Sequence, residues 1–150
     1  MSLREQLDAD LRDALRSGEE TRKVTIRGLI AAIHNAEIQT RGSLDDAAIT
    51  GIVGREIKQR RDSIEEYTKG NRPDLVAKEQ AELDVLSVYL PPQLSRDEIV
   101  AAARAVIERV GARGPADKGK VMGPIMAELR GKADGAEINA VVTELLSQAG

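Results

Sequence analysis

A run in the last third of the chain has the spacing of a loop that holds the phosphates of a nucleotide. Gly114 is followed after four residues by Gly119 and Lys120, and in such a loop the backbone N–H groups and the lysine bind the phosphates. The next position requires a serine or threonine hydroxyl for Mg²⁺, but Val121 stands there. Pro115 also removes one of the N–H donors that the loop would direct at phosphate. The sequence therefore does not predict a nucleotide site.

Residues that could move protons or hold a metal ion are few and scattered. His34 is the only histidine, and no aspartate or serine at a fixed spacing completes a catalytic triad with it. The absence of cysteine excludes disulfides, thiolate nucleophiles and thiolate metal sites. Several carboxylates are close in sequence but lack a histidine at ligand spacing: Glu65, Glu66, Glu79, Glu82 and Asp84. We expect exposed helix faces to carry these carboxylates, with no catalytic residue, metal or cofactor in the chain.

The stretch from Asp117 to Asn139 has the residues of a binding surface. It places glycine and proline inside an apolar, helix-periodic segment, although glycine costs about 1 kcal/mol there relative to alanine and proline about 3. Glycines four residues apart would let another helix or a nucleic-acid backbone approach closely. The candidate binding residues are two glycines and four cations: Lys118, Gly119, Lys120, Gly123, Arg130 and Lys132. Small residues beside cations predict a docking surface.

Two segments are basic although the net charge of the chain is −3. Residues 112–132 carry five cations against two carboxylates, and residues 55–61 carry four cations against one, so each segment has a net charge of +3. In the second segment, the candidate residues Arg55, Lys58 and Arg61 share one broad face of a helix. Contact with an RNA backbone and a solvated, salt-bridged face are both consistent with this patch. An anionic partner should meet one of the two segments.

The elements that must position these residues are all helices. The 150 residues are rich in Ala, Leu, Glu and Arg and include only two aromatic residues, Tyr67 and Tyr89, which favours helices over strands. Apolar residues recur at spacings of three and four. This pattern predicts seven helical segments, over residues 2–18, 21–42, 45–70, 73–90, 95–110, 117–129 and 136–148. Ser2 with Glu5 and Ser95 with Glu98 have the spacing of capping boxes.

Pro91 and Pro92 are the best candidate for a domain boundary, because they form a stiff, extended spacer. The fold class is therefore predicted as all-α, with an antiparallel domain of about four helices over residues 1–92 and a small three-helix domain over residues 93–150. The N-terminus is charged rather than apolar, and no apolar run approaches the roughly 20 residues that span a membrane. We accordingly expect no membrane contact and a cytoplasmic location.

Three runs of residues, occurring in order, make the chain similar to a known family. They are Lys58–Ile64, Tyr89–Ser95 and Gly119–Met126. Together they resemble the YqeY family, and the resemblance covers essentially the whole chain from the first helix to Leu146. It implies a helical N-terminal domain joined to a small three-helix domain.

The last third also resembles the tail of the B subunit of the glutamine-dependent aspartyl/glutamyl-tRNA amidotransferase. The shared elements are Gly123 with Met126, the turn 131–133, and the pairs 138–139 and 145–146. In that enzyme the tail is associated with holding tRNA. Its catalytic parts, a serine–lysine amidase on a separate subunit and a kinase-like cradle, have no counterpart in this sequence. The resemblance thus implies an association with a carbon–nitrogen ligase that uses glutamine as amide donor, without catalysis by this chain alone.

Three functions follow from these observations. The first is an accessory module that binds tRNA or another structured RNA. The second is a protein-interaction module that docks on an amidotransferase, on a synthetase or on itself without contacting RNA. The third is a free-standing amide-transfer enzyme, for which we expect no activity because neither a cysteine nor a serine–lysine site is present.

Overall fold

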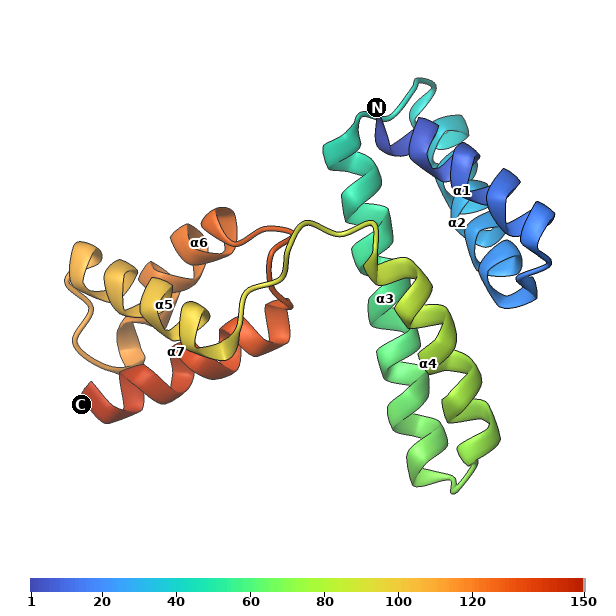
Figure 1. Ribbon diagram of the computed structural model, residues 1–150. Helices are drawn as coiled ribbons and strands as arrows, with labels where there is room; N and C mark the ends of the chain where they lie inside the picture. The colour runs from blue at the N-terminus through green and yellow to red at the C-terminus, as the bar shows by residue number, and fades with distance from the viewer. Residues whose placement is uncertain (150) are drawn as a thin grey trace. The chain divides into compact units, whose positions relative to one another are not determined.

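The computed structural model describes residues 1–149, and Figure 1 shows them as helices joined by turns and loops, with an extended connection between α4 and α5. This part of the chain contains seven α-helices, one 3-10 turn (η1) and no strand, which confirms the predicted all-α class. The elements are α1 (Leu3–Ser17), α2 (Glu20–Thr40), α3 (Asp46–Lys69), α4 (Pro73–Ser87), α5 (Arg96–Val110), η1 (Pro115–Asp117), α6 (Lys118–Glu128) and α7 (Gly135–Ala149). None of the described helices is both long enough and apolar enough to cross a membrane.

Side-chain caps start the first and fifth helices where the sequence predicts them. The Ser95 hydroxyl accepts the Glu98 N–H at 3.2 Å, and the Glu98 carboxylate accepts the Ser95 N–H at 3.1 Å, which completes the capping box of α5. At α1 the Ser2 hydroxyl accepts a hydrogen bond from the Glu5 N–H at 3.1 Å. The Glu5 carboxylate accepts a hydrogen bond from the Ser2 hydroxyl rather than from the Ser2 N–H, so the capping box of α1 is incomplete. Each cap satisfies an N–H group that the helix leaves unpaired.

α4 ends at Ser87, three residues earlier than predicted. The Tyr89 N–H donates to the Leu86 carbonyl at 3.0 Å, and the Leu90 N–H donates to the Ser87 carbonyl at 3.3 Å. These bonds span three residues rather than four, so the chain tightens into a turn before Pro91. A proline disfavours helical geometry in the residue before it, which explains the early end.

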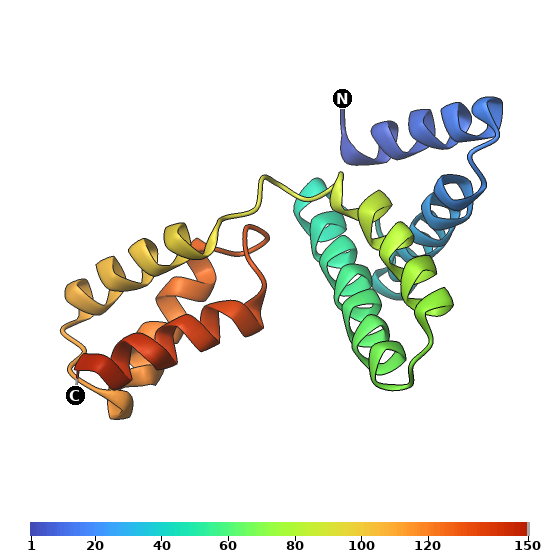
Figure 2. The ribbon, with the colours of Figure 1, turned by 60° about the horizontal axis from the view of Figure 1, so that its bottom comes forward.

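The first compact unit, Met1–Leu90, contains α1 to α4. Figures 1 and 2 both show α3 and α4 side by side as an antiparallel hairpin, and α1 packs on α2. Ten buried residues form its core: Leu7, Ile26, Leu29, Ile33, Ile49, Ile52, Val53, Ile57, Leu86 and Tyr89. Each fully buried aliphatic side chain contributes roughly 1.5–3 kcal/mol, so this core holds the helices in place.

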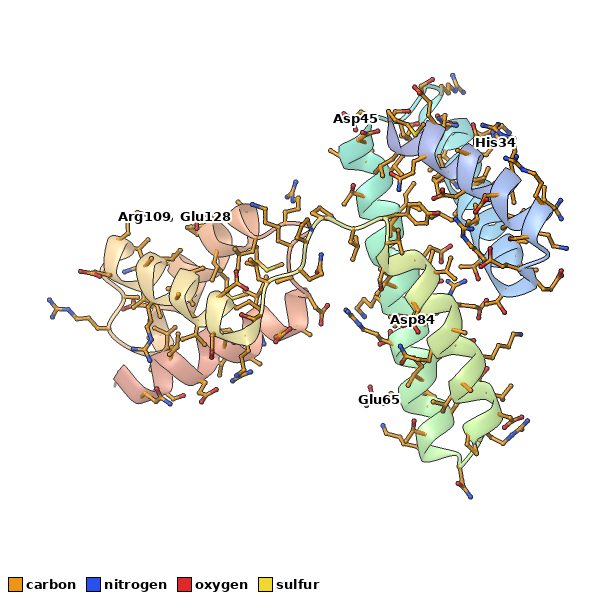
Figure 3. All side chains as sticks on the ribbon, in the orientation of Figure 1. His34, Asp45, Glu65, Asp84, Arg109 and Glu128 are labelled. Carbon is orange, nitrogen blue, oxygen red and sulfur yellow. The ribbon has the colours of Figure 1, made fainter. Side chains whose placement is uncertain are left out.

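The second compact unit begins at Pro91 and contains α5, η1, α6 and α7. Its three α-helices all pack against one another around a separate aliphatic core: Ile99, Ala103, Val106, Val121, Ile125, Leu129, Ile138, Val141, Val142 and Leu146. An exposed ion pair between Arg109 and Glu128, at 2.8 Å, joins α5 to α6 (Figure 3). Whether residues 1–92 and 93–150 fold as independent domains stays a prediction.

Candidate functional site

The turn between α6 and α7 carries two of the predicted cations on a well-anchored backbone. Gly131 has a φ of +76°, a left-handed conformation that suits glycine. The Leu94 N–H donates to the Lys132 carbonyl at 2.8 Å, and the Gln93 side-chain amide donates to the Gly131 carbonyl at 2.9 Å. The side chains of Arg130 and Lys132 are exposed. The backbone of the turn is thus fixed while its cations face solvent.

The other two cations of this segment lie in the first turn of α6, after a structured loop. The Asp117 carboxylate accepts the backbone N–H of Arg113 at 2.9 Å and pairs with the Lys120 ammonium at 3.4 Å. The hydrogen bond from Arg113 is the main cause that lowers the pKa of Asp117, and the charge of Lys120 contributes. Lys118 is half-buried, whereas Lys120 is exposed. Asp117 therefore organises the loop and partly offsets the charge of one candidate residue.

The four cations form two pairs rather than one cluster. α6 has 11 residues, and a helix rises about 1.5 Å per residue, so its ends lie about 16 Å apart. Lys118 and Lys120 stand at its beginning, while Arg130 and Lys132 follow its end. This separation suits an extended anion that offers several phosphates better than it suits a single phosphate group.

One face of α6 is open. Gly119, within the first pair of cations, and Gly123, between the two pairs, are exposed, and a Cβ added at either position would meet no atom within 4 Å apart from its chain neighbours. By contrast, a Cβ at Gly135 would lie 3.3 Å from the Met126 side chain. The chain's own packing does not explain Gly119, which costs up to about 1 kcal/mol in a helix, whereas at Gly123 the following Pro124 disfavours a side chain in helical geometry.

The second basic patch lies on α3. Arg55, Lys58 and Arg61 are all exposed, and Lys58 pairs with Asp62 at 3.4 Å across one helical turn. Such surface pairs are worth little in stability. Arg55 lines a groove of about 330 Å³ between α2 and α3. The two basic segments thus belong to different compact units, and each is a candidate surface of its own.

The residues considered for catalysis do not converge in the described structure. His34 is exposed on α2 (Figure 3), and within residues 1–149 no group of three histidine, cysteine, aspartate or glutamate side chains could hold a metal ion. Glu65 pairs with Lys69 at 3.4 Å, and Asp84 accepts from Gln80 at 2.9 Å. The residues that follow Gly114 form the 3-10 turn η1 and lead into α6, without the strand that precedes a phosphate-binding loop.

A polar network that sequence reasoning missed lies in the first unit. The Tyr89 hydroxyl donates to the Asp10 carboxylate at 2.6 Å, and the Arg22 guanidinium lies 3.6 Å from the same carboxylate. Burial is the main cause that raises the pKa of Tyr89 above its usual range, and the bond to Asp10 raises it further. Arg22 also bonds to Asp13 and Glu19 at 2.7 and 3.1 Å. The network fastens the chain after α4 to α1 and α2, and we assign it a structural role.

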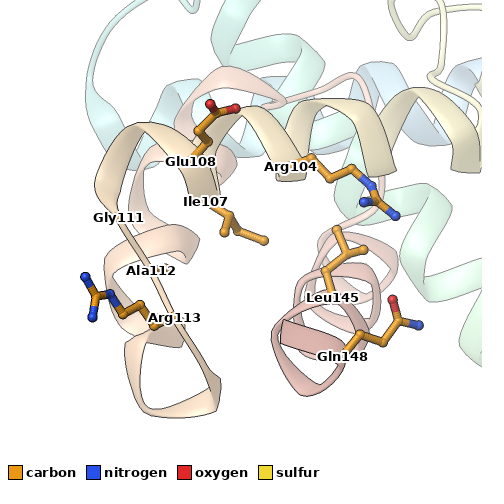
Figure 4. A pocket seen from close by; sticks show the side chains of 8 residues that line it. All are labelled: Arg104, Ile107, Glu108, Gly111, Ala112, Arg113, Leu145 and Gln148. Atoms are coloured by element: carbon orange, nitrogen blue, oxygen red, sulfur yellow. The ribbon is translucent and has the colours of Figure 1, made fainter. Parts of the chain in front are cut away.

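The second unit also has an open hollow of about 610 Å³ between the ends of α5 and α7 (Figure 4). Ile107 and Leu145 supply apolar lining, and Arg104 and Arg113 lie on opposite sides in this view. Leu145 and Gln148 are more than 30 residues away from the other lining residues, so no local signal could have identified the hollow. Its lining carries two arginines and the carboxylate of Glu108.

The comparisons with known proteins cover most of the chain. A family model described as "Yqey-like protein" matches residues 4–146. The protein named "Altered inheritance of mitochondria protein 41, mitochondrial" from Pyrenophora tritici-repentis is 36% identical over 134 residues, which are 88% of this chain and 74% of that protein. Its namesake from Lachancea thermotolerans is 38% identical over 112 residues, or 73% of this chain and 60% of that protein. The namesake from Saccharomyces cerevisiae is 40% identical over 85 residues, 56% of this chain and 46% of that protein.

These relatives contradict the predicted cytoplasmic location, because each is named as a mitochondrial protein. The prediction relied on a charged N-terminus and on the absence of a long apolar run. Neither feature distinguishes one aqueous compartment from another, so the inference was wrong. The matched region also spans only part of each relative, between 46% and 74% of its length in the three proteins described above.

Proposed function

Because the chain belongs to the YqeY family, as its three sequence runs predicted, we propose that it is an accessory module that binds tRNA or another structured RNA. The second compact unit makes the contact. Its action is linked by resemblance to the glutamine-dependent carbon–nitrogen ligase system, in which a similar tail is associated with tRNA. The chain itself performs no amide transfer in this proposal.

The observation that carries the proposal is the open, glycine-bearing face of α6 with a pair of cations near each end of the helix. Lysine and arginine bind phosphates through charge and hydrogen bonds, and this contact depends little on base sequence. The second unit contains no aromatic side chain, so its surface offers no platform on which single-stranded bases could stack. A folded RNA that presents its backbone is therefore the preferred partner.

The direct test measures tRNA binding at low and moderate salt for the parent protein and for the triple variant Lys118→Gln, Lys120→Gln, Lys132→Gln. The logarithm of the affinity falls as the logarithm of the salt concentration rises, and each phosphate contact makes this slope steeper by close to one. The slope of the triple variant should therefore be shallower than that of the parent protein by about two to three. Its affinity at low salt should fall steeply.

A matched control removes the same charge from the first unit, in Lys69→Gln, Arg72→Gln, Lys78→Gln, three exposed residues outside both candidate patches. The control should bind tRNA nearly as well as the parent protein. An equal loss of tRNA affinity in both variants would mean that the affinity depends only on the net charge of the protein. No binding by the parent protein at low salt would refute the proposal.

The second candidate function is protein docking through the same unit, without RNA. The partial exposure of Met126, 39%, beside the uncovered glycines favours it, because methionine adapts to apolar partners. Capture of partners from cell extract, with and without nuclease, separates the two functions. A synthetase or amidotransferase that stays bound after nuclease treatment supports docking, whereas loss of all partners supports RNA.

A free-standing amide-transfer activity has a simple assay. The purified chain should release no ammonia from glutamine, because its sequence contains neither a cysteine nor a recognisable serine–lysine site. Ammonia release that survives further purification would overturn this part of the proposal.

A further inference from the structure

The outer face of α2 carries an apolar stripe that nothing in the described chain covers. It contains Val24, Gly28, Ala31 and Ile38, and the polar Asn35 completes the alternating spacings of four and three that are typical of a helix–helix seam. All five are exposed, and Val24 and Ile38 are 51% and 63% exposed. A Cβ added at Gly28 would meet nothing within 4 Å. The stripe spans 14 residue steps, about 21 Å of helix, which matches a partner helix of about four turns.

Unpaired arginines flank this stripe. Arg27 and Arg41 lie on one side of it, on a seven-residue row that begins with Glu20 and includes His34, and all four residues are exposed. On the other side, Arg55 of α3 and Gln39 line the groove between α2 and α3, which Asn35 of the stripe borders. Within residues 1–149 the three arginines Arg27, Arg41 and Arg55 form no ion pair.

Carboxylates of α2 and α3 that border this face are engaged with other cations. Glu20 pairs with Lys23 at 2.8 Å, and Glu37 forms a salt bridge with Arg4 and also accepts the Leu44 N–H at 3.0 Å. Glu56, which lines the groove, pairs with Arg60 at 2.9 Å. The face therefore combines uncovered aliphatic groups with positive charge on both sides.

We propose that this face of α2 docks an acidic amphipathic helix of a protein partner. Aliphatic residues of that helix would cover Val24, Ala31 and Ile38, and its carboxylates would pair with the flanking cations. Gly28 would allow close approach of the two helices, since no side chain stands between them. This is the mode in which an amphipathic helix lies in an apolar groove with charges along its edges.

Two other occupants fit the face less well. An RNA backbone would gain from the arginines but nothing from the exposed aliphatic side chains, and the stripe offers no aromatic ring on which a base could stack. A second copy of this chain would bring the same arginines, Arg27 and Arg41, to the interface, where like charges repel. The charges thus select an acidic protein.

The test uses the full chain and a fluorescent amphipathic peptide of about 18 residues with leucine at positions i, i+3, i+4 and i+7 and glutamate on its flanks. One comparison peptide carries lysine in place of every glutamate, and another contains the same residues in scrambled order. The acidic peptide should bind saturably and more weakly as salt rises, and the two comparison peptides should not bind.

Variants of the chain then locate the site. Ala31→Glu places bulk and negative charge at the centre of the stripe and should weaken binding of the acidic peptide by about tenfold or more. Ala77→Glu, the same change at an exposed position of α4, should change binding by less than about twofold. The double variant Arg27→Gln, Arg41→Gln should weaken binding of the acidic peptide and flatten its salt dependence. It leaves the apolar side chains of the stripe on α2 unchanged.

Three results would overturn the proposal: equal binding of the acidic and lysine peptides, no effect of Ala31→Glu, or a loss of tRNA binding in Ala31→Glu with the peptide unaffected. Sedimentation adds a fourth, since a dimer of the parent protein that Ala31→Glu dissociates would identify a second copy as the occupant. The tRNA test in the second unit uses different residues, so the two proposals can fail independently.

Discussion

Thr25 is a buried polar residue on α2, and within the described residues its hydroxyl has no hydrogen-bond partner. A buried polar group without a partner costs about 1–3 kcal/mol. Thr25→Val keeps the shape of the side chain and removes the hydroxyl, so it should raise the free energy of unfolding of the first unit by about 1 kcal/mol. Urea denaturation followed by circular dichroism measures the change.

Thr50→Val is the matched control for this prediction. The Thr50 hydroxyl donates to the Asp46 carbonyl at 2.8 Å, so its loss should leave stability unchanged or lower it. A similar gain from both variants would show that valine simply suits these helices, and the argument from Thr25 would fail.

Tyr89 should make the first unit sensitive to alkaline pH. Its folded pKa is raised above the ordinary value of 10.0 by burial and by the bond to Asp10. The unfolded tyrosine loses its proton first, so the stability contributed by Tyr89 is complete below pH 10 and declines as pH rises toward the raised pKa. Tyr89→Phe should cost about 2 kcal/mol at neutral pH, because it removes a bond to a charged group, and should flatten the decline above pH 10.

Denaturation at pH 7 and at several pH values above 10 tests this expectation, with Tyr67→Phe as the control. The control should keep both the neutral stability and the alkaline decline of the parent protein. If Tyr89→Phe retained the same alkaline slope, the decline would have to come from other groups.

Residues that act locally were predictable, whereas residues that act through tertiary contacts were not. Ser95 and Glu98 lie three residues apart, and their capping box formed as predicted. Tyr89 and Asp10 lie 79 residues apart, and nothing in the local pattern around either residue indicates the other. The same reasoning explains why Arg104 and Arg113 were not connected with Leu145.

At the scale of the element, α6 and the turn after it contain two glycines whose replacement by alanine should have opposite effects on stability. Gly119 has open space where a Cβ would be, and Gly131 after the helix holds a φ of +76°. Gly119→Ala should therefore stabilise the second unit by up to about 1 kcal/mol. Gly131→Ala should destabilise it by about 1–2 kcal/mol, since alanine is strained in the left-handed conformation.

Thermal unfolding of the two variants measures these opposite shifts, and tRNA binding by Gly119→Ala tests whether the glycine has a functional role. A more stable variant that binds tRNA less well would mean that the glycine serves close approach rather than folding. Destabilisation by Gly119→Ala would contradict the open space around this position.

The extent of α6 was predicted within a residue or two, because apolar spacing identifies a helix even where glycine and proline weaken it. Its relation to the candidate cations was not predicted. In the sequence, Lys118, Lys120, Arg130 and Lys132 look like one basic segment, but the length of α6 separates them into two pairs. Anchoring of the turn by Leu94 and Gln93 also required the structure, because 38 residues separate Gln93 from Gly131.

At the scale of the whole molecule, the two aliphatic cores share no residue. This separation predicts that residues 93–150 fold alone, although a segment of this size is near the lower limit for an independent fold. The isolated segment should show helical circular dichroism and a cooperative thermal transition. Residues 1–92 should do the same, and a broad, non-cooperative transition in either fragment would contradict the predicted domain division.

The bond between Tyr89 and Asp10 also has a consequence for the order in which the chain is made. Asp10 leaves the ribosome early, whereas Tyr89 is among the last residues of the first unit to be synthesised. α1 and α2, and later α3 and α4, can pair as neighbours while translation continues, because closing a short loop costs little entropy. Tyr89, the partner of Asp10, is synthesised 79 residues later. The hydrogen bond therefore forms as one of the last steps and closes the first unit as translation proceeds into the second.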